Sequence, residues 1–247
     1  DLVDKGTESE YQVVRELLTP LDIPLYMIPG NHDDRDALRA VFSDHAYLFQ
    51  GGPFINYVVE DFPLRLVALD TFAPGRGSGA LCEARLAWLD ARLGEDRSRP
   101  TVIIMHHPPF ATGIGHMDAV GLSGKEALAQ VITRYSNVER ILCGHVHRPI
   151  HVRFAGTIAS TAPSNAHQIP LDLRVDAPSV FVMEPPACMV HTWIEGTGLV
   201  SHISYIGDYD GPYQFHKPVV DGEASSRHAE KRFKSGIDSD DENDGSA

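Results

Sequence analysis

Two spacings of apolar residues alternate along most of the chain, and each predicts a different secondary structure. Segments in which apolar residues recur every three to four positions predict helices with one buried face, at about 34–43, 83–94 and 124–135. A further helix should follow Thr7-Glu-Ser-Glu10, which has the sequence of a capping box. Short apolar runs predict buried strands, at 25–28, 55–59, 64–70, 101–105, 139–143 and 157–161. Strands that alternate with helices are typical of an α/β fold with a largely parallel sheet.

The last third of the chain has a different pattern. Segments 179–184, 188–195 and 199–206 are rich in β-forming residues, and Glu195-Gly-Thr-Gly198 is typical of a hairpin turn. After Tyr213 the sequence becomes polar and acidic, as disordered segments are. We therefore expect three parts: a core over 1–175, a β-rich segment over 176–216 that completes a second sheet or a cap, and a disordered acidic tail over 217–247.

Composition limits the class of protein. The 247 residues are 43% hydrophobic and 22% charged, values of a globular protein that can bury a full core. No apolar run approaches the roughly 20 residues of a membrane-spanning helix, and we expect a cytoplasmic location. A formal net charge of −13 argues against a large nucleic-acid surface. It does not exclude a small anionic substrate, because bound metal ions reverse the local field.

Polar side chains follow three of the predicted strands directly. Asn31-His32 follows the strand 25–28, His106-His107 follows 101–105, and Gly144-His-Val-His147 follows 139–143. A parallel sheet gathers its chemistry at the carboxyl ends of its strands. Carboxylate, amide and imidazole ligands brought there, with those of Asp1-Leu-Val-Asp4, can enclose two adjacent divalent cations, and such a pair suits phosphoester hydrolysis.

Each of these residues taken alone also has a purely structural explanation. Asp1 and Asp4 fit a turn or a helix cap, and Asn31 fits a turn. The histidine pair at His106 is poorly explained by packing, because imidazole is usually only partly buried. For His145 and His147 the metal interpretation is favoured, since alternating residues after a strand point the same way and imidazole is the commonest protein metal ligand.

Three motifs together resemble the calcineurin-like metallophosphoesterases. They are Pro29-Gly-Asn-His-Asp-Asp34, Met105-His-His-Pro-Pro109 and Cys143-Gly-His-Val-His147. Within that superfamily they are similar to the bacterial class III cyclic-nucleotide and glycerophosphodiester phosphodiesterases. His167-Gln-Ile-Pro170 and Gly211-Pro-Tyr213 also resemble the glycerophosphodiesterase branch. The resemblance covers most of residues 1–213.

The resemblance implies a metallo-dependent phosphatase-like α/β/β/α sandwich and a role for each motif residue. Asp1 would bridge two metal ions, with Asn31, His106 and His145 completing one site and His147 belonging to the other. His32 would be the acid for the leaving group, and Asp4 would hold its ring. Of the two remaining histidines, His167 would lie near the substrate phosphate, and His107 would lie behind the ligands without binding metal.

The function implied is metal-dependent hydrolysis of a small phosphodiester, of the cyclic-nucleotide or glycerophosphodiester type, by a hydroxide that two divalent ions activate. The mixed nitrogen and oxygen ligands fit Mn, Fe, Zn or Co alike. The diester would be selected by loops such as Ala111–Ser123. The alternatives are a phosphomonoesterase or protein phosphatase on the same core, or a non-catalytic scaffold. Relatives often assemble through the β-rich region, which makes a homo-oligomer an open expectation.

One departure from the family pattern concerns the first motif, Asp-x-His, which is absent before Asp1. The second metal ion would then be held only by Asp1 and His147, fewer than the three protein ligands of an ordinary catalytic zinc site. We expect that the chain belongs to a longer protein whose N-terminal strands are missing here. Residues 1–247 alone should then bind at most one metal ion tightly.

Overall fold

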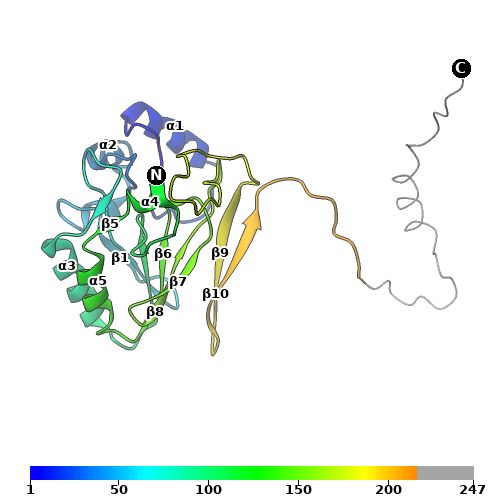
Figure 1. Cartoon of the computed structure of the whole chain (residues 1–247). Helices are drawn as coiled ribbons and strands as arrows, with labels where there is room; N and C mark the ends of the chain where they lie inside the picture. The colour runs from blue at the N-terminus through cyan, green and yellow to red at the C-terminus, as the bar shows by residue number, and fades with distance from the viewer. Residues whose placement is uncertain (216–247) are drawn as a thin grey trace, which may run out of the picture. The chain divides into compact units, whose positions relative to one another are not determined.

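A six-stranded sheet runs through the centre of the molecule, in the order β1–β2–β4–β6–β8–β7 (Figure 1). The computed structural model describes residues 1–215. The four inner strands β2, β4, β6 and β8 are parallel, and the edge strands β1 and β7 run antiparallel to their neighbours. The strands comprise, in this order, Tyr57–Val59, Arg65–Ala68, Thr101–Met105, Val138–Cys143, Thr157–Thr161 and His151–Phe154. The predicted, largely parallel α/β sheet is confirmed.

Helices α3 (Glu83–Glu95) and α5 (Lys125–Ile132) cover one face of this sheet (Figure 1). Their apolar positions fall three and four residues apart, so that they line one side of each helix. Leu89 and Leu128 from these helices are completely buried against Ile141 of β6 and its neighbours. This packing forms the larger of the two cores.

The second face is covered by the N-terminal helices and by a hairpin. Helices α1 (Glu8–Leu18) and α2 (Arg35–Val41) and the short 3-10 helix η1 (Ala46–Phe49) build a second core. Successive strand residues point to opposite faces, and accordingly Val67 of β2 lies in the first core while Ala68 lies in the second. The capping box predicted at Thr7 is present at the start of α1.

Strands β9 (Ala187–Ile194) and β10 (Gly198–Tyr205) form a separate two-stranded antiparallel sheet. It packs on β6, where Arg140 donates hydrogen bonds to Ser201 Oγ and to the carbonyl of Leu199. Figure 1 shows this hairpin on the side of the central sheet opposite α3 and α5. The predicted hairpin is confirmed, and it supplies a second sheet.

Several short elements of the structure were not predicted from the sequence. Strands β3 (Gly79–Ala80) and β5 (Leu122–Ser123) pair in parallel, and between them along the chain lies helix α4 (Gly115–Asp118). The edge strand β7 was also not predicted. Elements this short contain too few residues to show a spacing.

The predicted strand at 25–28 is wrong. This segment belongs to no strand, although it is extended beside the second core. The N–H of Met27 donates to Tyr47 Oη at 3.1 Å, and its carbonyl accepts from Tyr57 Oη at 3.0 Å. Two tyrosine hydroxyls thus satisfy the backbone N–H and carbonyl of Met27, which a neighbouring strand would satisfy in a sheet. Likewise 179–184 makes only a single bridge, between Val182 and Gln168.

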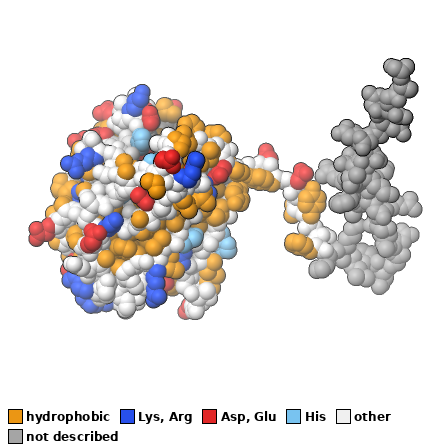
Figure 2. Space-filling model, in the orientation of Figure 1, with side chains coloured by type: hydrophobic (Ala, Val, Ile, Leu, Met, Phe, Trp, Pro, Cys, Tyr) orange, Lys and Arg blue, Asp and Glu red, His pale blue; other side chains and the backbone are white. Residues whose placement is uncertain are grey.

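The chain divides into two units, residues 1–207 and 208–247. Of the second unit only 208–215 are described, so the predicted tail at 217–247 lies outside the described residues. Within residues 1–215 no helix has both the length and the apolar character needed to cross a membrane. On the face shown in Figure 2, basic and acidic side chains are interspersed among apolar ones.

Two isoleucines on neighbouring strands test the position of the larger core. Ile141 is 0% exposed, whereas Ile158 is 41% exposed. Ile141→Ala should lower the free energy of unfolding by about 2–5 kcal/mol, because it leaves a cavity. Ile158→Ala, the matched control, should cost less than about 1 kcal/mol. Urea unfolding of both variants measures the difference, and equal losses would contradict the packing described.

Candidate metal centre

Four polar side chains from four separate segments meet at the carboxyl ends of β4 and β6. Asn31 Oδ1 lies 3.1 Å from His106 Nε2 and 2.9 Å from His145 Nδ1. His106 Nε2 also lies 3.3 Å from the carboxylate oxygen Oδ2 of Asp1. Residues up to 144 positions apart along the chain therefore place two oxygen atoms and two ring nitrogens around one point.

These separations are hydrogen-bond distances, and they also match the separations of ligands around one divalent ion. With metal–ligand bonds of about 2.1 Å, neighbouring ligands are about 3.0 Å apart in octahedral geometry and about 3.4 Å apart in tetrahedral geometry. The three distances of 2.9 to 3.3 Å fall in or next to this range. The donor set of one carboxylate, one amide and two imidazoles therefore fits a transition metal ion.

The hydrogen bond on the far side of His145 strengthens this fit. Its Nε2 donates to the carbonyl of Val120 at 3.1 Å, because a carbonyl can only accept. In the neutral ring Nδ1 then carries a lone pair, which points at another acceptor, Asn31 Oδ1, at 2.9 Å. Burial lowers the pKa of His145 to about 4 and holds that of His106 well below its usual value, so both rings are neutral near pH 7. A cation relieves the repulsion between such facing lone pairs.

The backbone that delivers His145 and His147 is not a continued strand. Strand β6 ends at Cys143, and both histidines have positive φ, +68° and +52°. Non-glycine residues adopt this conformation rarely and at a cost, often at functional sites. The expected alternation along a strand is therefore the wrong reason for their placement. A tight left-handed turn directs the two rings instead.

Gly30 is required by the approach of Asp1. A Cβ atom at Gly30 would lie 2.0 Å from Asp1 Oδ1 and 2.6 Å from the Asp1 nitrogen. Any larger residue would displace the carboxylate from Asn31 and His106. The glycine of the Gly30-Asn-His-Asp33 motif thus serves the close packing of two chain segments.

His147 lies beside the four converging residues and is oriented by the next loop. Its Nδ1 donates to the backbone carbonyl of His167 at 3.1 Å. The His167 ring contacts the His147 ring at a tilt of 58°, with centroids 4.7 Å apart, and it also contacts Phe181, with centroids 4.9 Å apart. Both histidines line the same cavity as Asp1.

His107 is close to the cluster but is not available as a ligand. Nitrogen atoms of His106, His107 and His145 lie within 4.8 Å of one another. However, His107 Nε2 donates to the carbonyl of Gly77 at 3.2 Å, and its Nδ1 contacts the hydroxyl of Thr71 at 2.8 Å. Burial lowers the pKa of His107 to about 2. Its role is to hold the end of β4 in place.

His32 and Asp4 lie at the exposed rim of the site. His32 Nδ1 donates to the backbone carbonyl of Asp4 at 2.9 Å, whereas the Asp4 carboxylate is 3.6 Å away. The close contact expected from the Asp4 side chain is thus made by its main chain. The backbone N–H of His32 donates to Asp1 Oδ1 at 2.9 Å, which ties the rim to the cluster.

A residue without a predicted role, Asp33, holds these segments together. It is 4% exposed, and its carboxylate accepts from Gly30 N–H at 2.7 Å, Leu2 N–H at 3.1 Å and Tyr11 Oη at 2.8 Å. The segment that carries Asp1 is thereby fixed to the turn that carries Asn31. The place of Asp33 in the motif Gly30-Asn-His-Asp33 was the one signal in the sequence, since the burial and the donors of this acid are visible only in the structure.

A cavity of about 680 Å³ opens beside the cluster. Met117, Val120 and Ile169 form an apolar part of its wall. The predicted site residues that line it are Asp1, Asp4, Asn31, His32, His145, His147 and His167. Of the predicted residues only His106 lies behind this wall, and it lines a smaller hollow of about 320 Å³ with Asp1 and Gly144.

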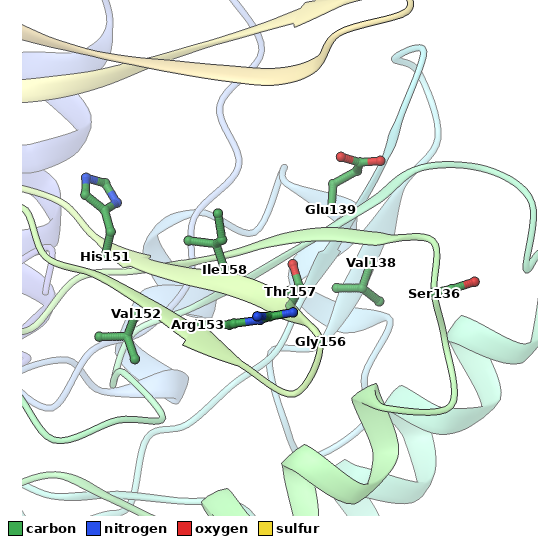
Figure 3. A pocket seen from close by; sticks show the side chains of 9 residues that line it. All are labelled: Ser136, Val138, Glu139, His151, Val152, Arg153, Gly156, Thr157 and Ile158. Atoms are coloured by element: carbon green, nitrogen blue, oxygen red, sulfur yellow. The ribbon is translucent and has the colours of Figure 1, made fainter.

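Another hollow, of about 580 Å³, lies at the opposite ends of the strands (Figure 3). It is lined by Val138 and Thr157, where β6 and β8 begin, whereas His145 follows the end of β6. Its ionisable side chains, Glu139, His151 and Arg153, point in different directions in Figure 3. They do not converge as the histidines do, so we place the chemistry at the carboxyl ends.

Comparisons with known proteins point the same way as the geometry. The family model described as calcineurin-like phosphoesterase matches residues 1–149. The chain is 42% identical over 217 residues to a probable glycerophosphodiester phosphodiesterase of Arcobacter nitrofigilis, covering 87% of this chain and 79% of that protein. It is 34% identical over 225 residues to a probable cyclic nucleotide phosphodiesterase of Rhodopseudomonas palustris, covering 89% and 80%. A solved dimetal phosphatase from Danio rerio has the same fold, with a TM-score of 0.53, 16% identity and coverage of 78% and 76%.

Replacement of the buried carboxylate tests its structural role. Asp33→Asn turns one acceptor oxygen into a donor that faces N–H and O–H groups, and should lower the free energy of unfolding by about 1–3 kcal/mol. Asp36→Asn, an exposed change in the first turn of α2, is the control and should cost less than about 1 kcal/mol. Thermal or urea unfolding measures both, and an Asp33→Asn protein as stable as the control would refute the assignment.

Proposed function

Because the chain belongs to the calcineurin-like phosphoesterase family, we propose that it hydrolyses small phosphodiesters in a metal-dependent reaction. The convergence of Asp1, Asn31, His106 and His145 beside an open cavity carries this proposal. The names of its relatives, a glycerophosphodiester and a cyclic nucleotide phosphodiesterase, support a diester over a monoester. The cavity is large enough for a phosphate with two small substituents.

The contacts among Asp1, Asn31, His106 and His145 support these four as ligands of one ion. Asp1 and His147 line the same cavity and would hold a second ion, more weakly because they are only two ligands. The ligand types suit Mn, Fe, Zn or Co. Bound divalent ions would stabilise charge on the phosphoryl oxygens and lower the pKa of a water molecule to near neutrality.

His32 is placed to supply a proton to the leaving group. The carbonyl of Asp4 fixes the Nδ1–H of this ring, so Nε2 is the nitrogen left to act on the substrate. In the protonated ring, the proton on Nε2 would pass to the alkoxide oxygen as the phosphorus–oxygen bond breaks. The exposed position of His32 at the cavity rim gives a departing alcohol direct access to solvent.

His167 would bind the phosphate from the other side of the cavity. Its ring lies between His147 and Phe181, and these contacts limit its rotation. A restrained ring loses less conformational freedom when it binds a ligand. His167 therefore orients the diester relative to His32 without changing covalently.

We also propose that the core ends at residue 175 and that copies of the chain associate through the β-rich segment that follows. Segment 176–216 contains the hairpin β9–β10, whose outer face bears Val190 and Ile194, 46% and 44% exposed. Apolar side chains in such positions support assembly of copies of the chain through this hairpin.

Substitutions distinguish metal binding from proton transfer. Asn31→Ala and His145→Ala should lower both the metal content and the turnover number, because each removes a ligand. His32→Ala should lower turnover about 10²–10⁴-fold while the metal content is retained. Mass spectrometry of bound metal and steady-state rates on a diester with a poor leaving group measure these effects. His202→Ala, on the exposed part of β10, is the control.

A His32→Ala enzyme as active as the wild type on that diester would contradict the role of His32. Metal content that is unchanged in Asn31→Ala would contradict the ligand assignment.

The reaction class is tested by the ratio of two rates. Turnover of bis-nitrophenyl phosphate should exceed that of mono-nitrophenyl phosphate at equal concentrations. Chelation should abolish both activities, and addition of Mn²⁺ should restore them, since the ions supply the charge stabilisation. A preference for mono-nitrophenyl phosphate would contradict the proposed diesterase activity and favour a phosphomonoesterase.

A further inference from the structure

The tautomer of His147 is set by a backbone carbonyl. Its Nδ1 lies 3.1 Å from the carbonyl oxygen of His167, and a carbonyl only accepts. In the neutral ring the proton must then be on Nδ1, which leaves the lone pair on Nε2. An Nε2 lone pair is what a metal ligand needs, so the position of one carbonyl decides whether this ring can bind.

The carbonyl of His167 belongs to a loop without regular secondary structure. The next residue, Gln168, holds this loop by hydrogen bonds. The N–H of Gln168 donates to the carbonyl of Val182 at 2.9 Å, and the N–H of Val182 donates back to the carbonyl of Gln168 at 2.9 Å. Gln168 is 3% exposed. The main chain on one side of the His167 carbonyl is therefore fixed by a reciprocal pair of bonds.

The side chain of Gln168 adds a second attachment. Its Nε2 donates to the carbonyl of Ser164 at 2.7 Å, and its Oε1 accepts from the Ser164 N–H at 3.1 Å. The Ser164 carbonyl also accepts from Ala187 N–H at 3.0 Å, where β9 begins. The carboxamide of Gln168 thus closes the turn 164–168 around His167, and the carbonyl of Ser164 joins this turn to the hairpin.

From these contacts we propose that Gln168 is a positioning residue for metal binding. It holds the His167 carbonyl where it accepts from His147 Nδ1–H, and so keeps His147 Nε2 free for the ion. This inference rests on the proposed function, which makes His147 a ligand. Buried groups that orient a ligating histidine commonly affect metal affinity about 10–100-fold.

A competing explanation is that ring contacts alone orient His147. Tilted ring contacts run from His147 to His167 and from His167 to Phe181. Phe181→Leu removes the last of these rings and leaves the bonds of Gln168 in place. This variant should keep the wild-type tautomer of His147, whereas a loss equal to that of the Gln168 variant would favour the ring contacts.

The decisive variant is Gln168→Glu, which keeps the shape of the side chain but loses the Nε2–H donor. A carboxylate oxygen then faces the Ser164 carbonyl and repels it. Gln130→Glu on the exposed side of α5 makes the same chemical change and is the matched control. Circular dichroism verifies that each variant is folded.

Two measurements on the full chain report the effect. Nitrogen-15 NMR of the metal-free protein should show His147 protonated only at Nδ1 in the wild type and control, and as a mixture of tautomers in Gln168→Glu. Titration with Co²⁺ up to concentrations that fill the weaker, second site should show about 10–100-fold weaker binding of that ion, which is the one that His147→Ala eliminates. A folded Gln168→Glu with wild-type tautomer and Co²⁺ affinity would overturn the inference.

A second variant covers the case in which Gln168→Glu does not fold. Val182→Pro removes the N–H that donates to the Gln168 carbonyl and leaves the side chain of Gln168 unchanged. It should give the same mixture of tautomers, and an unchanged tautomer would refute the proposal. A wild-type chain that binds no Co²⁺ would refute the proposed function, while the tautomer measurement would still decide the role of Gln168.

Discussion

The site depends on one buried carboxylate, that of Asp33. A charged group with 4% exposure is stable only when donors surround it, and Asp33 has two backbone N–H groups and the Tyr11 hydroxyl. These donors come from the first residues, from α1 and from the turn at Gly30. The carboxylate therefore brings three segments to one point. Asp1 and Asn31 become neighbours because their segments share this acceptor.

The contact between His145 and Asn31 is a costly arrangement that a bound cation makes favourable. With Nε2 donating to the carbonyl of Val120, His145 directs the lone pair of Nδ1 at the oxygen of Asn31. Two of the backbone positions, at His145 and His147, are in the rare left-handed region. A protein retains local conflict of this kind where the conflict serves binding. The geometry, the family and the named relatives consequently point to the same metal-dependent chemistry.

Backbone and hydroxyl groups behind the site orient the histidine rings. The carbonyl of Val120 accepts from His145, and the carbonyl of His167 accepts from His147. The ring of His107 is held by the hydroxyl of Thr71 and the carbonyl of Gly77. The carbonyl of Val120 comes from the loop between α4 and β5, and that of His167 from the loop before the hairpin. Loops of irregular structure thus determine which nitrogen of His145 and of His147 is left free for a ligand, while the sheet determines where the rings begin.

The sequence by itself determined the helices, the parallel strands, the hairpin and the chemistry of the motifs. The helices and strands depend on local spacing, since burial of one face repeats every two residues in a strand and every 3.6 in a helix. The roles expected of the motif residues came from the resemblance to the family. Only the tertiary structure decided that 25–28 is no strand, that His107 is fully bonded, and that Asp33 and Gln168 hold the site. Each of those outcomes depends on a hydrogen-bond partner supplied by another segment, such as Tyr47 for Met27 or Val182 for Gln168. The spacing of residues along the chain carries no information about such partners, because they become neighbours only when the sheet and its loops have packed.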